Sequence, residues 1–235
     1  MKKILLILFI IHTALFCQSQ TSGEFILQGL EKDKLNDFQG AILDYSQAIK
    51  ISPDSSLAYL FRAMSKQQIH DNTGAIDDYS KFIEIGPEIE DAFYFRGTAK
   101  HLIKDYQGAI RDYNKVIAMV NYTRPVYLKR GNAKYELQDY RGAILDYTKA
   151  IEIIPNLEEA YYFRGRAKSK LQDYRGGIAD FTKVIEENHI MKDAYLFRGI
   201  NKINLNEKDS GCLDFSKAGE LGDTQAYDLI KKYCQ

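Results

Sequence analysis

A 34-residue repeat occurs about six times between Glu24 and Tyr227, and it constrains the fold more than any other feature. One clear copy runs from Val126 to Glu159. At a shift of 34, glycine fills one column in five copies: Gly40, Gly74, Gly108, Gly142 and Gly176. An aromatic residue opens each copy: Phe25, Tyr59, Phe93, Tyr127, Tyr161 and Tyr195. A fixed period in this range is typical of solenoids, whose units bury their apolar faces by stacking on neighbours.

The repeat resembles the tetratricopeptide repeat, a helix-turn-helix unit of 34 residues. In the copy from Val126 to Glu159, the matching positions are Tyr127, Gly131, Ala143, Tyr147, Ala150 and Pro155. The resemblance implies an all-α protein, a right-handed superhelical solenoid of about six repeats starting near residues 24, 58, 92, 126, 160 and 194. The chain departs from the family in one column, where arginine stands at a position usually held by leucine.

Each repeat is expected to form two helices. In the fifth copy the first should run from Glu159 to Leu171, with Tyr161, Gly165, Leu171 and the stem of Lys168 facing inward. Gly165 costs the helix roughly 1 kcal/mol against alanine, which favours close packing of a neighbouring helix as its role. Asp173 is expected to cap the second helix, whose inward residues are Ile178, Phe181, Val184 and Ile185. The same cap recurs as Asp37, Asp71, Asp105 and Asp139.

The ends of the chain depart from the repeat. The first nineteen residues, with Lys2 and Lys3 before the apolar run from Ile4 to Phe16, predict a secretory signal peptide and a secreted or periplasmic protein. The run is too short for a membrane-spanning helix. A lipid anchor at Cys17 is a weaker alternative, since bulky residues precede it, and an uncleaved membrane anchor is weaker still. At the other end, residues 224–233 predict an amphipathic capping helix that closes a solenoid spanning residues 20–235.

Charge excludes some partners. Without Lys2 and Lys3, 30 basic side chains face 32 acidic ones, so the mature net charge is about −2. Nucleic-acid binding is therefore not expected, and no polybasic run favours anionic lipid.

Two charged columns predict a structural ion-pair ladder rather than a catalytic or anion-binding site. One column is arginine on the first helices: Arg62, Arg96, Arg130, Arg164 and Arg198. The other is aspartate on the second helices: Asp44, Asp78, Asp112, Asp146, Asp180 and Asp214. An arginine that replaces a core leucine needs a partner, and Asp146 or Asp112 could supply one to Arg130. A lysine column from Lys32 to Lys202 is expected to cover the core with its stems and reach surface acids, with a polyanion track as the weaker alternative.

The remaining cysteines and histidines show no catalytic pattern. Cys212 and Cys234 are a possible disulfide that would join the last repeat to the capping helix, whereas two cysteines without a nearby histidine make a poor metal site. His101 has no acid or nucleophile at a defined spacing. No motif for a metal or cofactor is present, and an enzyme is not expected.

The resemblance implies a concave groove lined by the first helices, where family members bind their ligands. The corresponding residues are Leu60, Met64, Tyr94, Thr98, His101, Leu128, Asn132, Tyr135, Tyr162 and Arg166. Aromatic anchors mixed with polar side chains suit an extended peptide or a partner helix. The competing interpretation is that these residues only pack against one another.

The sequence thus predicts a monomeric, non-enzymatic interaction module that binds a protein or peptide. The alternative is a structural or assembly scaffold in a cell-envelope complex, possibly self-associating.

Overall fold

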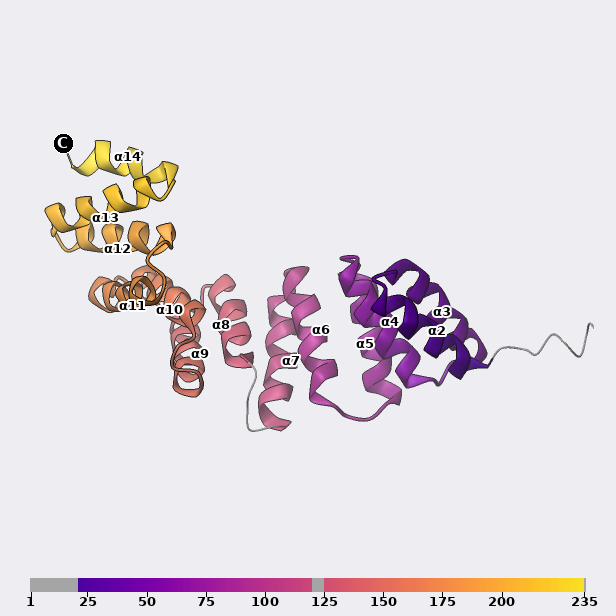
Figure 1. Ribbon diagram of the computed structural model, residues 1–235. Helices are drawn as coiled ribbons and strands as arrows, with labels where there is room; N and C mark the ends of the chain where they lie inside the picture. Colours follow the sequence, from indigo (N-terminus) through magenta and orange to yellow (C-terminus); the bar gives the residue numbers. More distant parts are fainter. Residues whose placement is uncertain (1–20, 120–124, 235) are drawn as a thin grey trace, which may run out of the picture. The chain divides into compact units, whose positions relative to one another are not determined.

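The computed structural model describes residues 21–119 and 125–234 of the chain. The predicted signal peptide and the lipid-anchor alternative at Cys17 lie outside the described residues. Thirteen α-helices occupy the described part: α2 Ser22–Lys34, α3 Phe38–Ile51, α4 Ser56–Gln68, α5 Asn72–Ile85, α6 Glu90–Leu102, α7 Tyr106–Met119, α8 Val126–Glu136, α9 Tyr140–Ile153, α10 Glu158–Lys170, α11 Tyr174–Glu187, α12 Lys192–Asn204, α13 Lys208–Glu220 and α14 Thr224–Tyr233 (Figure 1). Successive helices form antiparallel pairs, so the predicted all-α class is confirmed.

The described residues fall into two compact units that divide between Ala92 and Phe93. The first contains α2 to α5, and the second begins within α6 and continues to α14. From α2 to α5, and again from α7 to α14, each helix packs on the helices before and after it in the chain. This nearest-neighbour pattern is what stacked repeats produce.

The turn inside each repeat depends on a residue with positive φ. In each of the six repeats, one residue of the turn between the two helices adopts φ between 60° and 67°: Asn36, His70, Lys104, Gln138, Gln172 and Asn206. This left-handed residue turns the chain out of the first helix, although none of the six is glycine. An aspartate follows in five repeats and caps the second helix, as Asp173 does by accepting a hydrogen bond from the Gly176 amide at 3.0 Å.

The core of each repeat centres on one aromatic residue of the second helix. Their side chains are fully buried: Tyr45, Tyr79, Tyr113, Tyr147, Phe181 and Phe215. Glycine on the first helix makes room for five of them, because a Cβ on Gly131, for example, would lie 2.7 Å from Tyr147 Cε1; in the second repeat Ala63 holds this position. The close-packing role expected for Gly165 has the same cause, since its Cβ would meet Phe181 at 3.0 Å.

The expected inward face of the fifth first helix was partly wrong. Leu171 is 42% exposed, because α10 ends at Lys170 and Leu171 lies in the turn. Ala160 and Ala167 are buried instead, and with Gly165 they let the neighbouring helices approach closely.

The C-terminal helix α14 closes the array on α13. Asp223 caps it by accepting from the Gln225 and Ala226 amides at 2.9 and 3.2 Å. Leu229, Ile230 and Tyr233 pack toward Phe215 of α13. A disulfide joins Cys212 of α13 to Cys234, with the two Cα atoms 5.8 Å apart.

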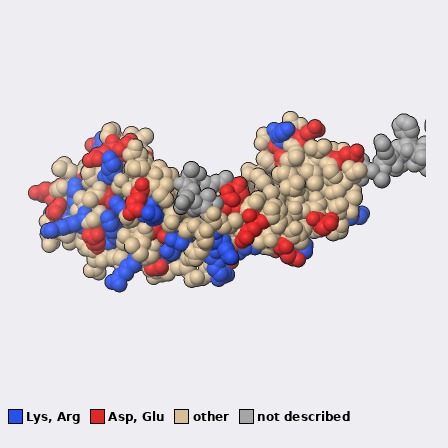
Figure 2. Space-filling view, turned by 90° about the horizontal axis from the view of Figure 1, so that it is seen from below, with Lys and Arg blue, Asp and Glu red and all other residues tan. Residues whose placement is uncertain are grey.

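Charged side chains of both signs are interspersed on the face shown in Figure 2. No helix among the described residues is both long and apolar enough to cross a membrane.

Candidate functional site

Arginine and aspartate of the two charged columns form bidentate ion pairs within five of the six repeats. Arg164 donates from Nε to Asp180 Oδ2 at 3.0 Å and from Nη2 to Oδ1 at 2.7 Å. The other pairs have the same sixteen-residue spacing: Arg62 with Asp78, Arg96 with Asp112, Arg130 with Asp146, and Arg198 with Asp214. Of the two partners considered for Arg130, the structure pairs it with Asp146. We call this set the ion-pair ladder.

The lysine column joins the same aspartates. Lys168 Nζ lies 2.8 Å from Asp180 Oδ2, and Asp180 is only 3% exposed. The expectation that these lysines reach acidic groups at the surface was therefore wrong, because each bonds a buried carboxylate. In the first repeat, where Gln28 replaces arginine, Lys32 still lies 2.7 Å from Asp44.

The third contact of these arginines reaches the preceding repeat. Arg164 Nη1 donates to Thr148 at 3.1 Å, and Arg198 Nη1 donates to Thr182 at 3.2 Å. Each guanidinium also lies over the aromatic ring three residues earlier, 5.4 Å from the Tyr161 centroid for Arg164. The ladder therefore ties adjacent repeats together, and its charges are not available to a ligand.

Three residues of the predicted groove are largely buried. Leu128 is 1%, Tyr162 8% and Tyr135 9% exposed, because close helix packing places them in the core. Their side chains lie mostly inside the helix packing rather than on the surface of the predicted groove. Leu60 and Met64 lie on α4 in the first unit, where Met64 is 41% exposed.

Two further residues of the predicted groove accept hydrogen bonds from the hydroxyls of core tyrosines. Asn132 accepts a hydrogen bond from the Tyr147 hydroxyl at 2.9 Å, and Thr98 accepts one from Tyr113 at 3.5 Å. Tyr94 packs on Tyr113 with ring centroids 6.2 Å apart. These residues pack and bond to one another, as the competing interpretation holds.

His101 is half-buried and lies edge-on to Tyr106, with centroids 5.2 Å apart. Burial lowers the pKa of its imidazole, while Glu136 opposes and Lys129 adds to this effect. No group of three or more metal-ligating side chains occurs among the described residues.

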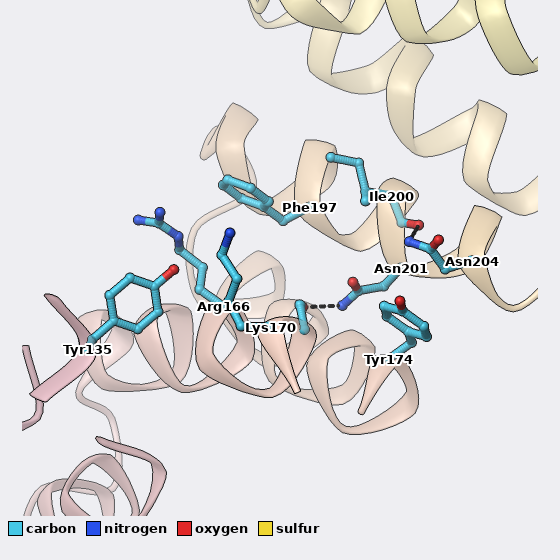
Figure 3. A pocket seen from close by; sticks show the side chains of 9 residues that line it. Tyr135, Arg166, Lys170, Tyr174, Phe197, Ile200, Asn201 and Asn204 are labelled. Atoms are coloured by element: carbon cyan, nitrogen blue, oxygen red, sulfur yellow. Dashed lines mark hydrogen bonds between the residues drawn. The ribbon is translucent and has the colours of Figure 1, made fainter. Parts of the chain in front are cut away.

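A hollow of about 250 Å³ opens between α10 and α12. It is lined by Tyr135, Arg166, Ser169, Lys170, Tyr174, Phe197, Ile200, Asn201 and Asn204. In Figure 3, Arg166 and Lys170 rise from α10 while Phe197 and Ile200 face them from α12. Of the predicted groove residues, the structure brings only Tyr135 and Arg166 to this hollow, with Tyr162 beneath Arg166.

Arg166 is surrounded by aromatic rings. Its guanidinium carbon lies 5.3 Å from the Tyr135 centroid, 5.7 Å from Tyr162 and 5.3 Å from Phe197. Burial raises the pKa of the Tyr135 and Tyr162 phenols, and the Arg166 charge opposes that rise. Cation–π contacts of this kind hold a guanidinium in place without neutralising it.

The floor of the hollow contains a buried amide that sequence reasoning missed. Asn201 is 1% exposed and donates to the Ser169 hydroxyl at 2.7 Å (Figure 3). Gly177 makes room for it, since a Cβ there would lie 2.3 Å from Asn201 Nδ2. Both residues replace alanines of other repeats, such as Ala167 and Ala143, and this paired departure was the available signal.

Two family models match this part of the chain. Residues 131–172 match a model described as TPR repeat, and residues 158–188 match one described as Tetratricopeptide repeat. Residues 131–188 are therefore similar to tetratricopeptide repeats. The matched repeats carry Tyr135, Arg166, Ser169 and Lys170 of the hollow. No curated protein sequence matches the chain.

Several solved structures share the fold. A structure of MamA protein is 26% identical, with a TM-score of 0.68 over 72% of this chain and 92% of MamA. YrrB, described as a TPR protein with an unusual peptide-binding site, is 18% identical, with a TM-score of 0.69 over 80% of this chain and 97% of YrrB. Pseudomonas aeruginosa pilF is 14% identical, with a TM-score of 0.69 over 90% and 96% of the two chains. The last two likenesses show the fold alone.

Proposed function

We propose that the protein is a non-enzymatic interaction module that binds a segment of a partner protein on the first-helix face of its second unit. The observation that carries this proposal is the hollow between α10 and α12. Its side chains include Arg166 and Lys170, which have no ion pair with an acidic side chain in the described part of the chain, and the exposed amide of Asn204. Such groups at the edge of an aromatic cluster are the kind that bind proteins.

The remaining notable residues have structural roles. The ladder charges are paired, since each of its five aspartates bonds an arginine and a lysine, as Asp180 bonds Arg164 and Lys168. Asp44 of the first repeat bonds Lys32. Repeat solenoids present extended surfaces for binding. YrrB, a protein of the same fold, is described with a peptide-binding site, and this likeness supports a peptide or protein ligand here.

Affinity capture tests the proposal. The mature chain is used as bait in an extract of the cells that make it, with cross-linking and mass spectrometry of the bait–partner contacts. A Lys170→Glu, Asn204→Glu variant should lose a partner that cross-links to α10 or α12. The matched control is Gln107→Glu, Arg175→Glu, which makes the same charge change at exposed positions of α7 and α11. Equal loss in both variants, or cross-links only elsewhere, would reject the site.

Exposed leucines support a second candidate function, a self-associating scaffold. One column of the second helices carries Leu43, Leu145 and Leu213, which are 65%, 72% and 72% exposed. Apolar side chains at a repeated surface position could pair copies of the chain. Multi-angle light scattering separates the two functions: a monomer at every concentration tested argues against the scaffold.

We also propose that the chain is exported to the periplasm or the medium. The basic start and apolar run of residues 1–19 support this, as does the disulfide between Cys212 and Cys234, since such bonds persist in oxidising compartments. Mass spectrometry of the native protein should find an N-terminus at Gln20. Retained Met1, or a lipid on Cys17, would contradict it.

A further inference from the structure

The hollow between α10 and α12 is positively charged. None of its nine lining residues is acidic, while Arg166 and Lys170 are cations. A neighbouring hollow of about 400 Å³ shares Arg166, but there Lys192 is accompanied by Asp193 and Asp223, so its charges nearly balance. The excess positive charge therefore belongs to the first hollow.

Arg166 differs from the five arginines of the ladder. Each of those has a buried aspartate sixteen residues later, whereas the residue sixteen after Arg166 is Thr182, which accepts from Arg198 instead. Arg166 has four aromatic rings within 6 Å of its guanidinium carbon and no ion pair within the described residues. It is held in place while its charge remains available.

The core of the same repeat does not need a hydrogen-bonding group from Arg166. In the preceding repeat, Asn132 accepts a hydrogen bond from the Tyr147 hydroxyl. Arg166 occupies the equivalent position and has no acceptor atom, and the core residue is Phe181, which has no hydroxyl to satisfy. The guanidinium is therefore not needed by the core.

The rest of the hollow fits an extended peptide. Phe197 and Ile200 are half-buried and present apolar surface. Asn204 is exposed at the far end and donates through Nδ2 to the Ile200 carbonyl at 2.9 Å. Its side-chain oxygen can accept from a peptide N–H, while Lys170 is exposed on the α10 side of the hollow, near Arg166 (Figure 3).

We propose that this hollow binds an internal acidic side chain, Asp or Glu, of an extended partner segment through Arg166 and Lys170, with a neighbouring apolar side chain against Phe197 and Ile200. This inference rests on the proposed function and specifies its ligand. An arginine forms two parallel hydrogen bonds with a carboxylate, and charge complementarity selects the occupant.

A display selection tests the ligand class. The full mature chain is used to select from a library of random linear 12-residue peptides fused at both ends, so that no terminal carboxylate is present. Enriched sequences should contain Asp or Glu next to an apolar residue. Synthetic copies, acetylated and amidated, should bind Arg166→Gln and Lys170→Gln variants more weakly by roughly tenfold or more, the effect of losing one charged hydrogen bond. Replacing the acidic residue by its amide should have the same effect on the wild type.

Arg175→Gln is the control, because it removes an equal charge at an exposed position outside the hollow. Lys170 is also exposed, so its variant tests the proposal even where Arg166→Gln unfolds the chain. Enriched peptides that need no acidic residue, or that bind both variants at wild-type affinity, would overturn this inference and leave the proposed function standing. If the selection enriches no peptide that binds at α10 and α12, that result would count against both this inference and the proposed function.

Discussion

Each buried aspartate of the ladder satisfies both of its oxygens within the protein. Asp146 accepts from Arg130 through both oxygens and from Lys134 at 2.7 Å, while it is only 3% exposed. A buried carboxylate keeps its charge at an acceptable cost only when such partners are present. The ladder thus replaces apolar contacts by matched charges without leaving any for a ligand.

Removing one partner should therefore destabilise the protein strongly. Arg130→Leu leaves Asp146 with Lys134 alone, and the loss of unfolding free energy is expected near the lower end of about 3–5 kcal/mol. The combined change Arg130→Leu, Lys134→Met, Asp146→Leu should cost less, because no buried charge remains unpaired. Urea unfolding followed by circular dichroism measures both. An unchanged midpoint for Arg130→Leu would show that the pairs do not hold the repeats together.

The buried tyrosines make stability sensitive to alkaline pH. Burial raises the pKa of Tyr113 to about 12, and burial also raises the pKa of Tyr45, Tyr79 and Tyr147. The unfolded chain ionises near pH 10 and the folded chain does not, so stability is full below pH 10 and falls as pH rises from about 10 toward 12.

The expected slope is about 1.4 kcal/mol per pH unit for each such tyrosine. Urea midpoints measured from pH 9 to 11.5 should show it, and Tyr113→Phe should make the fall less steep. A parallel fall in wild type and variant would mean that Tyr113 does not contribute.

At the scale of elements, Asn201 and Gly177 each replace an alanine found in other repeats, and the two replacements depend on each other. A Cβ at position 177 would lie 2.3 Å from Asn201 Nδ2 and 2.9 Å from Ser169 Oγ. Glycine in α11 is therefore required by the amide of α12. The pair shapes the floor of the hollow, since Asn201 bonds Ser169 of α10.

This coupling predicts opposite effects of one substitution in two backgrounds. Gly177→Ala alone should destabilise the protein by about 1–3 kcal/mol through overpacking. In an Asn201→Ala background the same change should be neutral or stabilising by up to about 1 kcal/mol, the helix preference of alanine over glycine. Thermal unfolding of the four proteins of the cycle measures this. Additive effects would show that the two residues are not in contact.

The elements themselves followed from the sequence, whereas the site followed only in part. The 34-residue period predicted the helix pairs, Asp173 and its equivalents predicted the caps, and the helix from 224 to 233 was placed at its observed bounds. Side-chain direction was harder. Leu128, Tyr135 and Tyr162 share a face with Arg166, but how far each is buried depends on the separation of adjacent helices, which the period does not determine. The sequence did not predict that Lys170 and Asn204 line one hollow, because this depends on how α10 and α12 lie relative to each other.

At the scale of the whole molecule, stability in stacked repeats is a sum of unit and nearest-neighbour terms. A change at one end should thus act locally. The two compact units, divided between Ala92 and Phe93, give this expectation a natural test, because the disulfide lies entirely in the second.

Loss of the disulfide should loosen the C-terminal cap and leave the first unit unchanged. The bond closes a loop of 22 residues, so its removal should cost about 3 kcal/mol, mainly through the entropy returned to the unfolded chain. The Cys212→Ser, Cys234→Ser protein should exchange its α13 and α14 amides faster in hydrogen-exchange mass spectrometry, since fewer contacts then hold α14. The α2 to α5 amides should keep wild-type protection, and the wild type in reducing agent should reproduce the variant. Faster exchange throughout α2 to α5 would instead mean that the units unfold together, and that the cap stabilises the whole chain rather than the end it covers.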